Sequence, residues 1–307
     1  MAVPHISGAF GDLLDVRFQE IFESAKQYNE LQSMLPKLYT MPAHNGRNDM
    51  RWSQVGTLPD FEEFTGNVSY TSQAQGYDTT MTFVEFTNGI QVERKLFDDD
   101  QYHIMDQKPQ ALADAYYRTK ERLGARPLNN AFSIDNYFSV NSESVALCSN
   151  SHTTTSGAST ASGFDNLGTA SLTATAVMAA MIQSRGYRGD QAERIGITVD
   201  ELWIPIDLVE QAYEINNSMG KLDTANNNPN YLKGRFTIHE WNYLTDTNNW
   251  FLMDSNMRRK MLFWVDRVPL EFAMVEDFDK LIAKWRAYCR MAGAHIDWRF
   301  IHGSQVS

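Results

Sequence analysis

Seven histidines and two cysteines are the side chains of this sequence best suited to hold a metal or to transfer protons. No two histidines are three or four residues apart, the spacing that places two metal ligands on one helical face. The cysteines, Cys148 and Cys289, form no CxxC pair, which excludes a zinc ribbon or a disulfide scaffold and fits a reducing compartment. The histidines are His5, His44, His103, His152, His239, His295 and His302.

A hydrolase built on Cys148, Ser151 or His152 is one chemistry that this spacing would allow. Such a nucleophile needs a rigid site that lowers the pKa of the thiol. Residues 149–171 are rich in Ser, Thr and Gly, which predicts a mobile loop rather than a rigid site. We therefore interpret His152 as an ordinary loop histidine.

Three further patterns resemble ligand sites but lack their full spacing. Gly220-Lys221 resembles the end of a phosphate-binding loop, but Ile215 stands where its first glycine is required. Asp98-Asp99-Asp100 could attract a cation, yet its spacing is not that of an EF-hand, and a solvated helix start is the simpler interpretation. The pairs Glu62-Glu63 and Glu271 with Glu276 are interpreted as surface charge. We expect no catalytic, cofactor-binding or metal-binding residue, and thus no enzyme.

The composition is that of an acidic globular protein. Its 307 residues, with a mass of 35.0 kDa, are enough for one large domain or two small ones. Hydrophobic residues make up 43% and charged residues 21%, which argues against disorder throughout. The 27 Lys and Arg against 38 Asp and Glu give a net charge of -11, which argues against a dedicated nucleic-acid binder but not against a wall around nucleic acid. No apolar run reaches the roughly 18 residues of a membrane span, and no secretory signal is visible at the start.

Helical periodicity is clearest in four segments. Residues 12–35 form an amphipathic stripe that we expect Pro36 to end, with Tyr28 on the buried side. The strongest pattern runs from 107 to about 132, where Gly124 and Pro127 are expected to bend or interrupt the helix. The next segments are predicted in the order helix, strand, helix. They are a helix at 172–184, a short buried strand at 202–204 and a helix that begins at Pro205.

Strand patterns and polar loops occupy most of the rest. Residues 51–97 alternate with a period of two, which predicts one long hairpin with turns at Gly66-Asn67 and at Gly76-Tyr77-Asp78. A hairpin of that length needs another surface to brace it. Further strands are expected at 235–239, 250–253 and 261–265, and the tail 281–302 reads as two runs split at Ala292-Gly293. Loops are expected at 38–49, 149–171 and 217–234, the last too rich in Asn to pack as core.

These elements share one property: several cannot bury their own apolar side chains. An N-terminal helix and arm without a core, a projecting hairpin and large polar loops imply surfaces that cover them, in the same chain or in a neighbouring one. The order of the elements resembles the major capsid protein of tailed double-stranded-DNA phages, with the Hong Kong 97-type fold, and is most similar to the Mu-like major head subunit branch. The resemblance is carried by Arg51-Trp52 through Leu58-Pro59, Phe64-Thr65-Gly66, Ile90-Gln91-Val92-Glu93-Arg94, Phe97-Asp98-Asp99-Asp100, Leu202-Trp203-Ile204-Pro205 with Leu208 and Ala212, Asn228-Pro229-Asn230 through Gly234, Tyr243-Leu244 and Trp250-Phe251-Leu252.

The resemblance implies an α+β fold with four parts. Residues 1–50 would be the N-terminal arm and 51–97 the extended loop that lies over a neighbouring subunit. Residues 98–145 and 272–307 would form the peripheral domain, with a long spine helix at 107–132. Residues 146–271 would be the axial domain, whose loop 220–234 would point at the pentamer or hexamer axis.

The function implied is a major head protein that self-assembles into pentamers and hexamers, forming an icosahedral shell around double-stranded DNA without sequence-specific binding. The expected partners are other copies of the chain, a separate scaffolding protein, a portal protein and a decoration protein, with no membrane. The expected location is the virion, assembled in the host cytoplasm. Two alternatives stay open at this point: an encapsulin-like compartment that houses an enzyme cargo, and a hydrolase with a carboxylate or His152 site.

Overall fold

The computed structural model describes residues 11–43, 46–68, 70, 72–93, 95, 106–220, 228–277 and 282–306. The described residues combine helices with three β-sheets and divide into two compact units. Unit 1 draws on residues 1–36, 83–124 and 266–291, and unit 2 on 37–82, 125–265 and 292–307. Both units are therefore assembled from segments far apart in the sequence. His5, His44, His103, Asp98-Asp99-Asp100 and Lys221, which the sequence analysis considered, lie outside the described residues.

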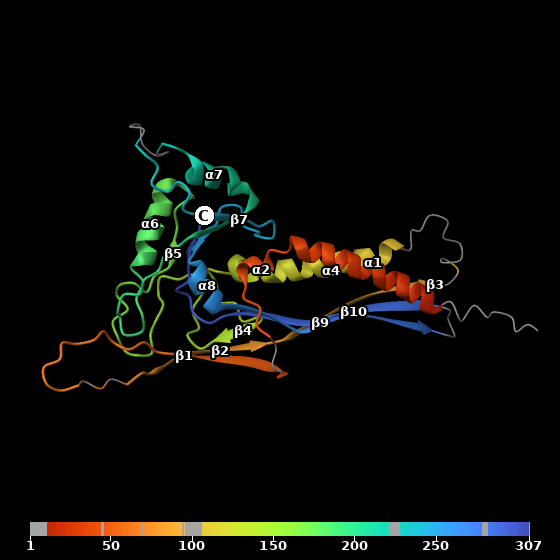
Figure 1. Ribbon diagram of the computed structural model, residues 1–307, viewed down its shortest axis with the longest axis horizontal. Coiled ribbons are helices and arrows are strands. Elements are labelled where there is room, and N and C mark those ends of the chain that lie inside the picture. Colours follow the sequence, from red (N-terminus) through yellow and green to blue (C-terminus); the bar gives the residue numbers. More distant parts are fainter. Residues whose placement is uncertain are drawn as a thin grey trace, which may run out of the picture. The chain divides into compact units, whose positions relative to one another are not determined.

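Unit 1 packs two helices and a sheet around an aromatic core. Helix α1 lies along α4, and the sheet has the order β3-β10-β9, with β3 antiparallel to β10 (Figure 1). Phe18 packs on Trp285 at a ring distance of 4.9 Å, and Phe22 stacks on Phe272 at 4.5 Å. The elements are α1 (Gly11–Gln32), β3 (Val84–Glu93), α4 (Gln107–Gly124), β9 (Leu262–Asp277) and β10 (Ile282–His295), the last two continuing into unit 2.

The N-terminal helix therefore finds its apolar partner within its own chain. Part of the predicted buried face was wrong: Tyr28 is 65% exposed, whereas Phe22 is fully buried. The predicted helix end was also wrong, because α1 stops at Gln32 and Pro36 lies inside the short helix α2 (Leu35–Leu38). The buried carboxylate of Glu121 on α4 accepts hydrogen bonds from the hydroxyl of Ser33 and the amide of Met34, which fixes the chain where α1 ends.

Unit 2 is built on a five-stranded sheet of mixed direction, with the order β5-β11-β8-β6-β7. β6 is parallel to β7 and antiparallel to β8, and all residues of β6, β8 and β11 are buried. In the sequence, strands buried on both faces consist of unbroken runs of apolar residues, such as residues 202–204 and 250–252. The elements are α5 (Arg126–Asn129), β5 (Leu167–Gly168), α6 (Ala174–Arg185), β6 (Glu201–Ile204), η3 (Ile206–Leu208), α7 (Val209–Asn217), β7 (Thr237–Glu240), β8 (Trp250–Met253), α8 (Ser255–Met261) and β11 (Ile301–Ser304).

A second sheet of unit 2, with the order β1-β2-β4, contains the predicted hairpin. β1 (Asp49–Val55) pairs antiparallel with β2 (Gln75–Thr82), and β2 pairs with β4 (Ser139–Asn141). The hairpin is shorter than 51–97, because the chain leaves it after Thr82 and β3 joins the sheet of unit 1. Gly66 has the positive φ of a turn, at +109°, but Gly76 lies within β2, so a turn there was wrong.

The remaining expectations were confirmed in some segments and wrong in others. The expected interruption at Gly124 and Pro127 is confirmed, because α4 ends at Gly124 and Pro127 lies in a separate helix, α5, but the expected extension of the long helix to about 132 was wrong. Helix, strand and helix follow at α6, β6 and α7, as expected. Helix α8 was missed, and β9 is far longer than 261–265. The tail is not split at Ala292-Gly293, because β10 runs through both residues and the break comes before β11.

Candidate assembly surface

Residues 56–74, which we call the strap, connect β1 to β2 and carry large apolar side chains that nothing in the described chain covers. Figure 1 shows the strap leaving the ends of these strands as a long loop without regular structure. A monomer does not gain by exposing so much apolar surface in one segment, so such a patch is typical of a contact site. The exposed fractions are 51% for Leu58, 107% for Phe61, 71% for Phe64, 63% for Val68 and 93% for Tyr70.

The base of the strap, in contrast, is firmly held within unit 2. The backbone amide of Gly56 donates to the carbonyl of Ala74 at 2.9 Å, which closes the neck of the loop. On β1, Trp52 stacks on Phe263 at 5.5 Å, and the amide of Gln54 donates to the carbonyl of Ile296. The strap is therefore an uncovered segment on an anchored base.

The other strand of the base, β2, is joined to the polar loop 142–166. The hydroxyl of Tyr77 lies 2.6 Å from that of Thr153, and Thr155 donates to the carbonyl of Gln75 at 2.9 Å. The amide of Asp78 donates to the hydroxyl of Ser142 at 2.9 Å. How this loop is held therefore decides how well the strap is oriented.

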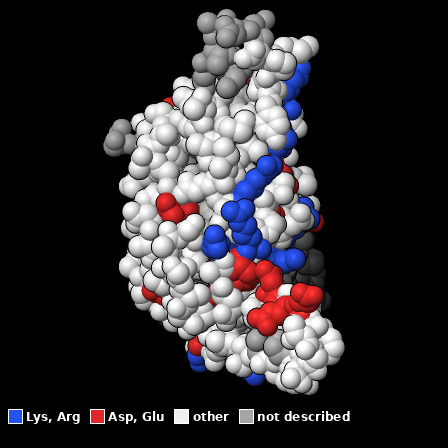
Figure 2. All heavy atoms as spheres, turned by 90° about the vertical axis from the view of Figure 1, so that its left-hand side faces the viewer, with Lys and Arg blue, Asp and Glu red and all other residues white. Residues whose placement is uncertain are grey.

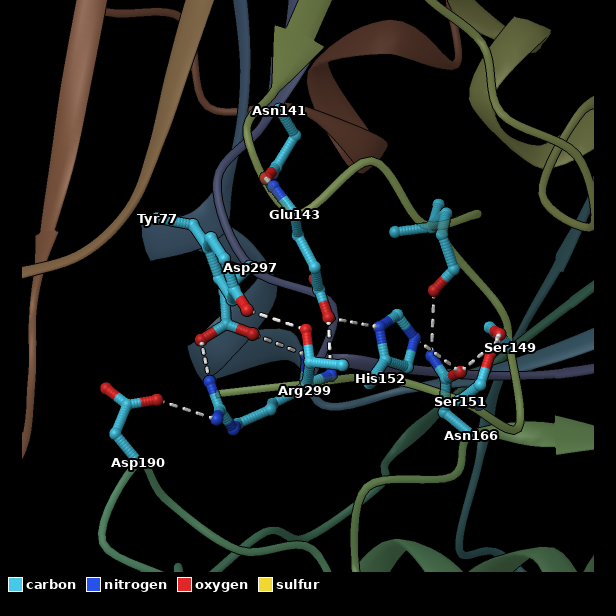
Figure 3. Close-up of polar contacts among 12 residues, drawn as sticks. Tyr77, Asn141, Glu143, Ser149, Ser151, His152, Asn166, Asp190, Asp297 and Arg299 are labelled. Atoms are coloured by element: carbon cyan, nitrogen blue, oxygen red, sulfur yellow. Dashed lines mark hydrogen bonds and ion pairs between the residues drawn. The ribbon is translucent and has the colours of Figure 1, made fainter. Parts of the chain in front are cut away.

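His152 organises that loop (Figure 3). It is 2% exposed, and its ring stacks on Trp298 at 4.2 Å. Nδ1 lies 3.1 Å from Glu143 Oε1, and Nε2 lies 3.1 Å from Asn166 Oδ1. The amide of Asn166 cannot be reversed, because its nitrogen donates to the carbonyls of Leu147 and Ile301. Both ring nitrogens thus face acceptors that belong to two different parts of the loop, so the ring ties these parts together.

The expectation of a mobile loop at 149–171 was therefore wrong in its buried part. His152 is not paired with Cys148, whose thiol is buried and whose pKa is raised far above its usual range by that burial, so the cysteine–histidine pair is not formed. Ser151 bonds only to the neighbouring Ser149 among the contacts described. The histidine acts here as a link between distant segments.

A second buried link in this region is Arg299, which is 6% exposed. Its guanidinium donates to Asp297 at 2.7 Å, to Asp190 at 2.9 Å and to the carbonyl of Arg188 at 2.7 Å (Figure 3). These bonds join the segment before β11 to the turn after α6. A charge this deeply buried is tolerated because each guanidinium nitrogen has an acceptor and two of the acceptors are carboxylates.

The ion pair between Arg258 and Glu201 anchors the chain that leads into β1. Nε and Nη2 of Arg258 each lie 2.8 Å from a carboxylate oxygen of Glu201, and the indole of Trp203 donates to the same carboxylate at 3.1 Å. Arg258 also donates through Nη1 to the carbonyl of Leu38. Thr40 then pairs with β9 on either side of Phe263, so the segment before the hairpin lies fixed on the sheet. Sequence reasoning missed this pair because Arg258 lies in a polar stretch with no periodic signal.

Two other surfaces expose apolar side chains in the same way. In the loop expected at 217–234, Met219 is 80% and Tyr231 52% exposed, while the side chain of Asn230 bonds the carbonyls of Ile215 and Ser218 and so fixes the loop base. Leu232 is buried, so that loop contributes to the core after all. On α1, the exposed large apolar residues are Val16, Tyr28 and Leu31.

The remaining residues considered for chemistry do not converge. Glu62 and Glu63 lie exposed on the strap, and Glu271 is exposed on β9, whereas the side chain of Glu276 is not described. His239 stacks on Trp203 and lies 4.0 Å from Glu201, and burial lowers its pKa. Across the described ranges, no group of three or more His, Cys, Asp or Glu side chains is placed to hold a metal ion. Among the helices that are described, none is both long and apolar enough for a membrane span.

Removing one partner of the buried ion pair should destabilise unit 2 strongly. We expect Glu201→Gln to lower the free energy of unfolding by roughly 3–5 kcal/mol, because Arg258 would stay buried without its counter-charge. Urea denaturation followed by tryptophan fluorescence measures this. Arg51→Gln is the matched control: it breaks the exposed pair with Asp78, and a loss of no more than about 1 kcal/mol is expected. Equal losses for the two variants would contradict this assignment.

The pH dependence of stability should carry the signature of a buried neutral histidine. Burial lowers the pKa of His302 to about 4, and its side chain is 2% exposed. An unfolded histidine has a pKa of about 6.5, so between these values only the unfolded state binds this proton. Unfolding free energy should therefore fall as the pH falls from about 6.5 to 4. The slope of the unfolding free energy against pH is proportional to the number of protons taken up on unfolding. We expect His302→Gln to reduce that number by up to one; an unchanged slope would show that His302 is not responsible.

Comparisons with known proteins identify the family. A family model described as "Phage capsid protein" matches residues 76–302. No curated protein sequence matched. Solved structures with a similar fold include the capsid of a native GTA particle (TM-score 0.58, 11% identity, covering 89% of each chain) and the mature capsid of bacteriophage PhiM1 (0.56, 9%, covering 90% of this chain and 87% of that one). A third is the capsid of Cyanophage P-SCSP1u (0.55, 13%, covering 88% and 86%). The chain therefore belongs to the phage capsid protein family.

Proposed function

We propose that copies of this subunit form the pentamers and hexamers of a phage head, with the Hong Kong 97-type architecture, and enclose double-stranded DNA without reading its sequence. The observation that carries the proposal is the strap: an anchored base with five large apolar side chains in solvent. Its apolar surface becomes buried only if another molecule covers it, and in a shell of identical subunits the nearest such molecule is another copy. The mechanism is burial at contacts, and the role is structural rather than enzymatic.

The four parts expected from the sequence receive roles within this proposal. Residues 1–50 act as the N-terminal arm. Within 51–97, the hairpin with its strap acts as the extended loop over a neighbour, whereas β3 stays in the subunit's own sheet. Residues 98–145 with 272–307 act as the peripheral domain, and 146–271 as the axial domain, with 220–234 at the symmetry axis. Exposed Tyr231 within this loop and exposed Met219 just before it support a contact role, because apolar side chains near an axis pack against their symmetry copies.

The proposal extends to partners and location. A separate scaffolding protein, a portal protein and a decoration protein complete the head, and the particle is assembled in the host cytoplasm. Membership of the Mu-like branch stays a prediction from the sequence resemblance. The family match favours a phage head over a cargo-carrying compartment, because the model that matches is one of phage capsid proteins.

Shortening the strap should abolish assembly without unfolding the subunit. Replacing residues 57–73 by Asn-Gly keeps Gly56 and Ala74 at the neck and suits the tight turn of a two-residue hairpin. The deletion must end before Gln75, since β2 begins there and Tyr77 bonds to Thr153. We expect a soluble subunit with unchanged far-ultraviolet circular dichroism that forms no closed shells by electron microscopy and sedimentation, with the scaffolding protein present or absent.

The unmodified chain prepared in parallel should form shells. A variant with Asn67→Ser and Gln73→Ser is the matched control, since it changes the strap without removing apolar surface, and it should assemble as the unmodified chain does. Closed shells from the shortened chain would refute the role of the strap.

A further inference from the structure

The strap combines aromatic side chains with negative charge. Between Asp60 and Phe64, two phenylalanines alternate with three carboxylates, and residues 56–74 contain no Lys or Arg. Phe61 is fully exposed and is flanked by Asp60 and Glu62. Figure 2 shows acidic side chains gathered in the lower part of the face toward which the strap projects in Figure 1. A surface that receives this segment must be apolar with a cation at its edge.

Unit 1 contains a hollow with these properties, between helix α4 and the sheet β3-β10-β9. It has a volume of about 270 Å³, several times the roughly 30 Å³ of one water molecule, so it holds a side chain. Arg122 is exposed at its edge, and Lys120 lies close by with its ammonium 5.7 Å from the ring of Tyr116, although it also pairs with Asp266. Most of the lining is apolar or aromatic, including Phe86, Leu112, Tyr116, Leu270, Ala287 and Met291.

The titratable groups inside the hollow are neutral. Burial, together with the charge of Asp266, raises the pKa of the Tyr116 hydroxyl far above its usual range. Burial and the same carboxylate raise the pKa of the Cys289 thiol to about 11. No carboxylate lines the hollow, and the nearby carboxylate of Asp266 is paired with Lys120 at 2.7 Å, which offsets its repulsion of an acidic segment.

Two other hollows of the described chain do not fit. One, lined by Arg126, Asp135 and His295 among others, has room for only about 40 Å³, which excludes an aromatic ring. The other lies between α1 and α4 and is larger, but Glu20 and Asp114 line it, and these carboxylates would repel the strap.

We infer that the strap of one subunit places Phe61 or Phe64 in the hollow between α4 and the sheet of a second copy, with the neighbouring carboxylates facing Arg122. This inference rests on the proposed shell and names the acceptor surface within it. Apolar burial supplies the attraction, since a phenylalanine contributes roughly 1.5–3 kcal/mol on full burial. The charge pair at the edge chiefly fixes which part of the strap enters.

The native thiol of Cys289, which lines the hollow, allows a direct test. In a Cys148→Ala background, Phe61→Cys and Phe64→Cys are made separately, and assembled shells are treated with diamide. The reaction is run at alkaline pH, because burial raises the pKa of the Cys289 thiol and the thiolate is the reactive form. At least one variant should give several-fold more covalent multimers on a denaturing gel than Tyr70→Cys, an equally exposed strap position outside the acidic segment. The multimers should disappear when Cys289→Ala is added.

The second readout comes from exchanging the charges of the proposed pair. Arg122 is suited to this exchange because it is exposed, so its substitution leaves the core intact. Arg122→Glu should reduce the shell yield several-fold, and adding Glu62→Lys with Glu63→Lys should restore it. Shells that form normally but show no cross-link above the Tyr70→Cys level, or no restoration by the charge exchange, would overturn this inference while leaving the shell intact. Absence of shells from the unmodified chain would instead contradict the proposed function itself.

Discussion

The constraint behind the proposed assembly is that this chain leaves a large apolar surface uncovered on one segment. Each strap side chain is worth roughly 1.5–3 kcal/mol when fully buried, whereas bringing two proteins together costs about 4–15 kcal/mol. One or two anchored side chains therefore cannot hold a pair of subunits firmly. If each subunit both gives and receives a strap, contacts form around a ring, and once the ring closes the last association is intramolecular. Weak individual contacts also allow misplaced subunits to leave before a shell closes.

A segment acts as an anchor for a neighbour only if its base is rigid. Here β1 and β2 are fixed by a stack on Phe263 and by the loop that His152 holds. The chain before β1 is fixed by Arg258, which reaches both Glu201 and the carbonyl of Leu38. The links made by His152 and Arg258 are polar and buried, so each is costly to break. The apolar core closes around them without using the strap, which leaves the strap available for contacts.

The sequence allowed much of the element order to be predicted, because local signals decide it. The apolar run at β8, the interruption of the long helix near Gly124 and the helix after Pro205 needed no knowledge of distant residues. Helix α8 and the buried ion pair could not be predicted, since Arg258 becomes a core residue only through a partner 57 positions away. His152 was misread for the same reason: its acceptors and its stacking partner Trp298 belong to separate segments. The strap was predicted as a projecting hairpin, but its uncovered side chains became visible only in the structure.

The most direct test of this account is an electron cryomicroscopy map of shells assembled from the unmodified chain, at a resolution that shows side chains. The account predicts density for the strap against a neighbouring subunit, with Phe61 or Phe64 enclosed between the α4 helix and the sheet of that neighbour. Closed shells in which residues 56–74 lie in solvent, or contact only their own subunit, would contradict it.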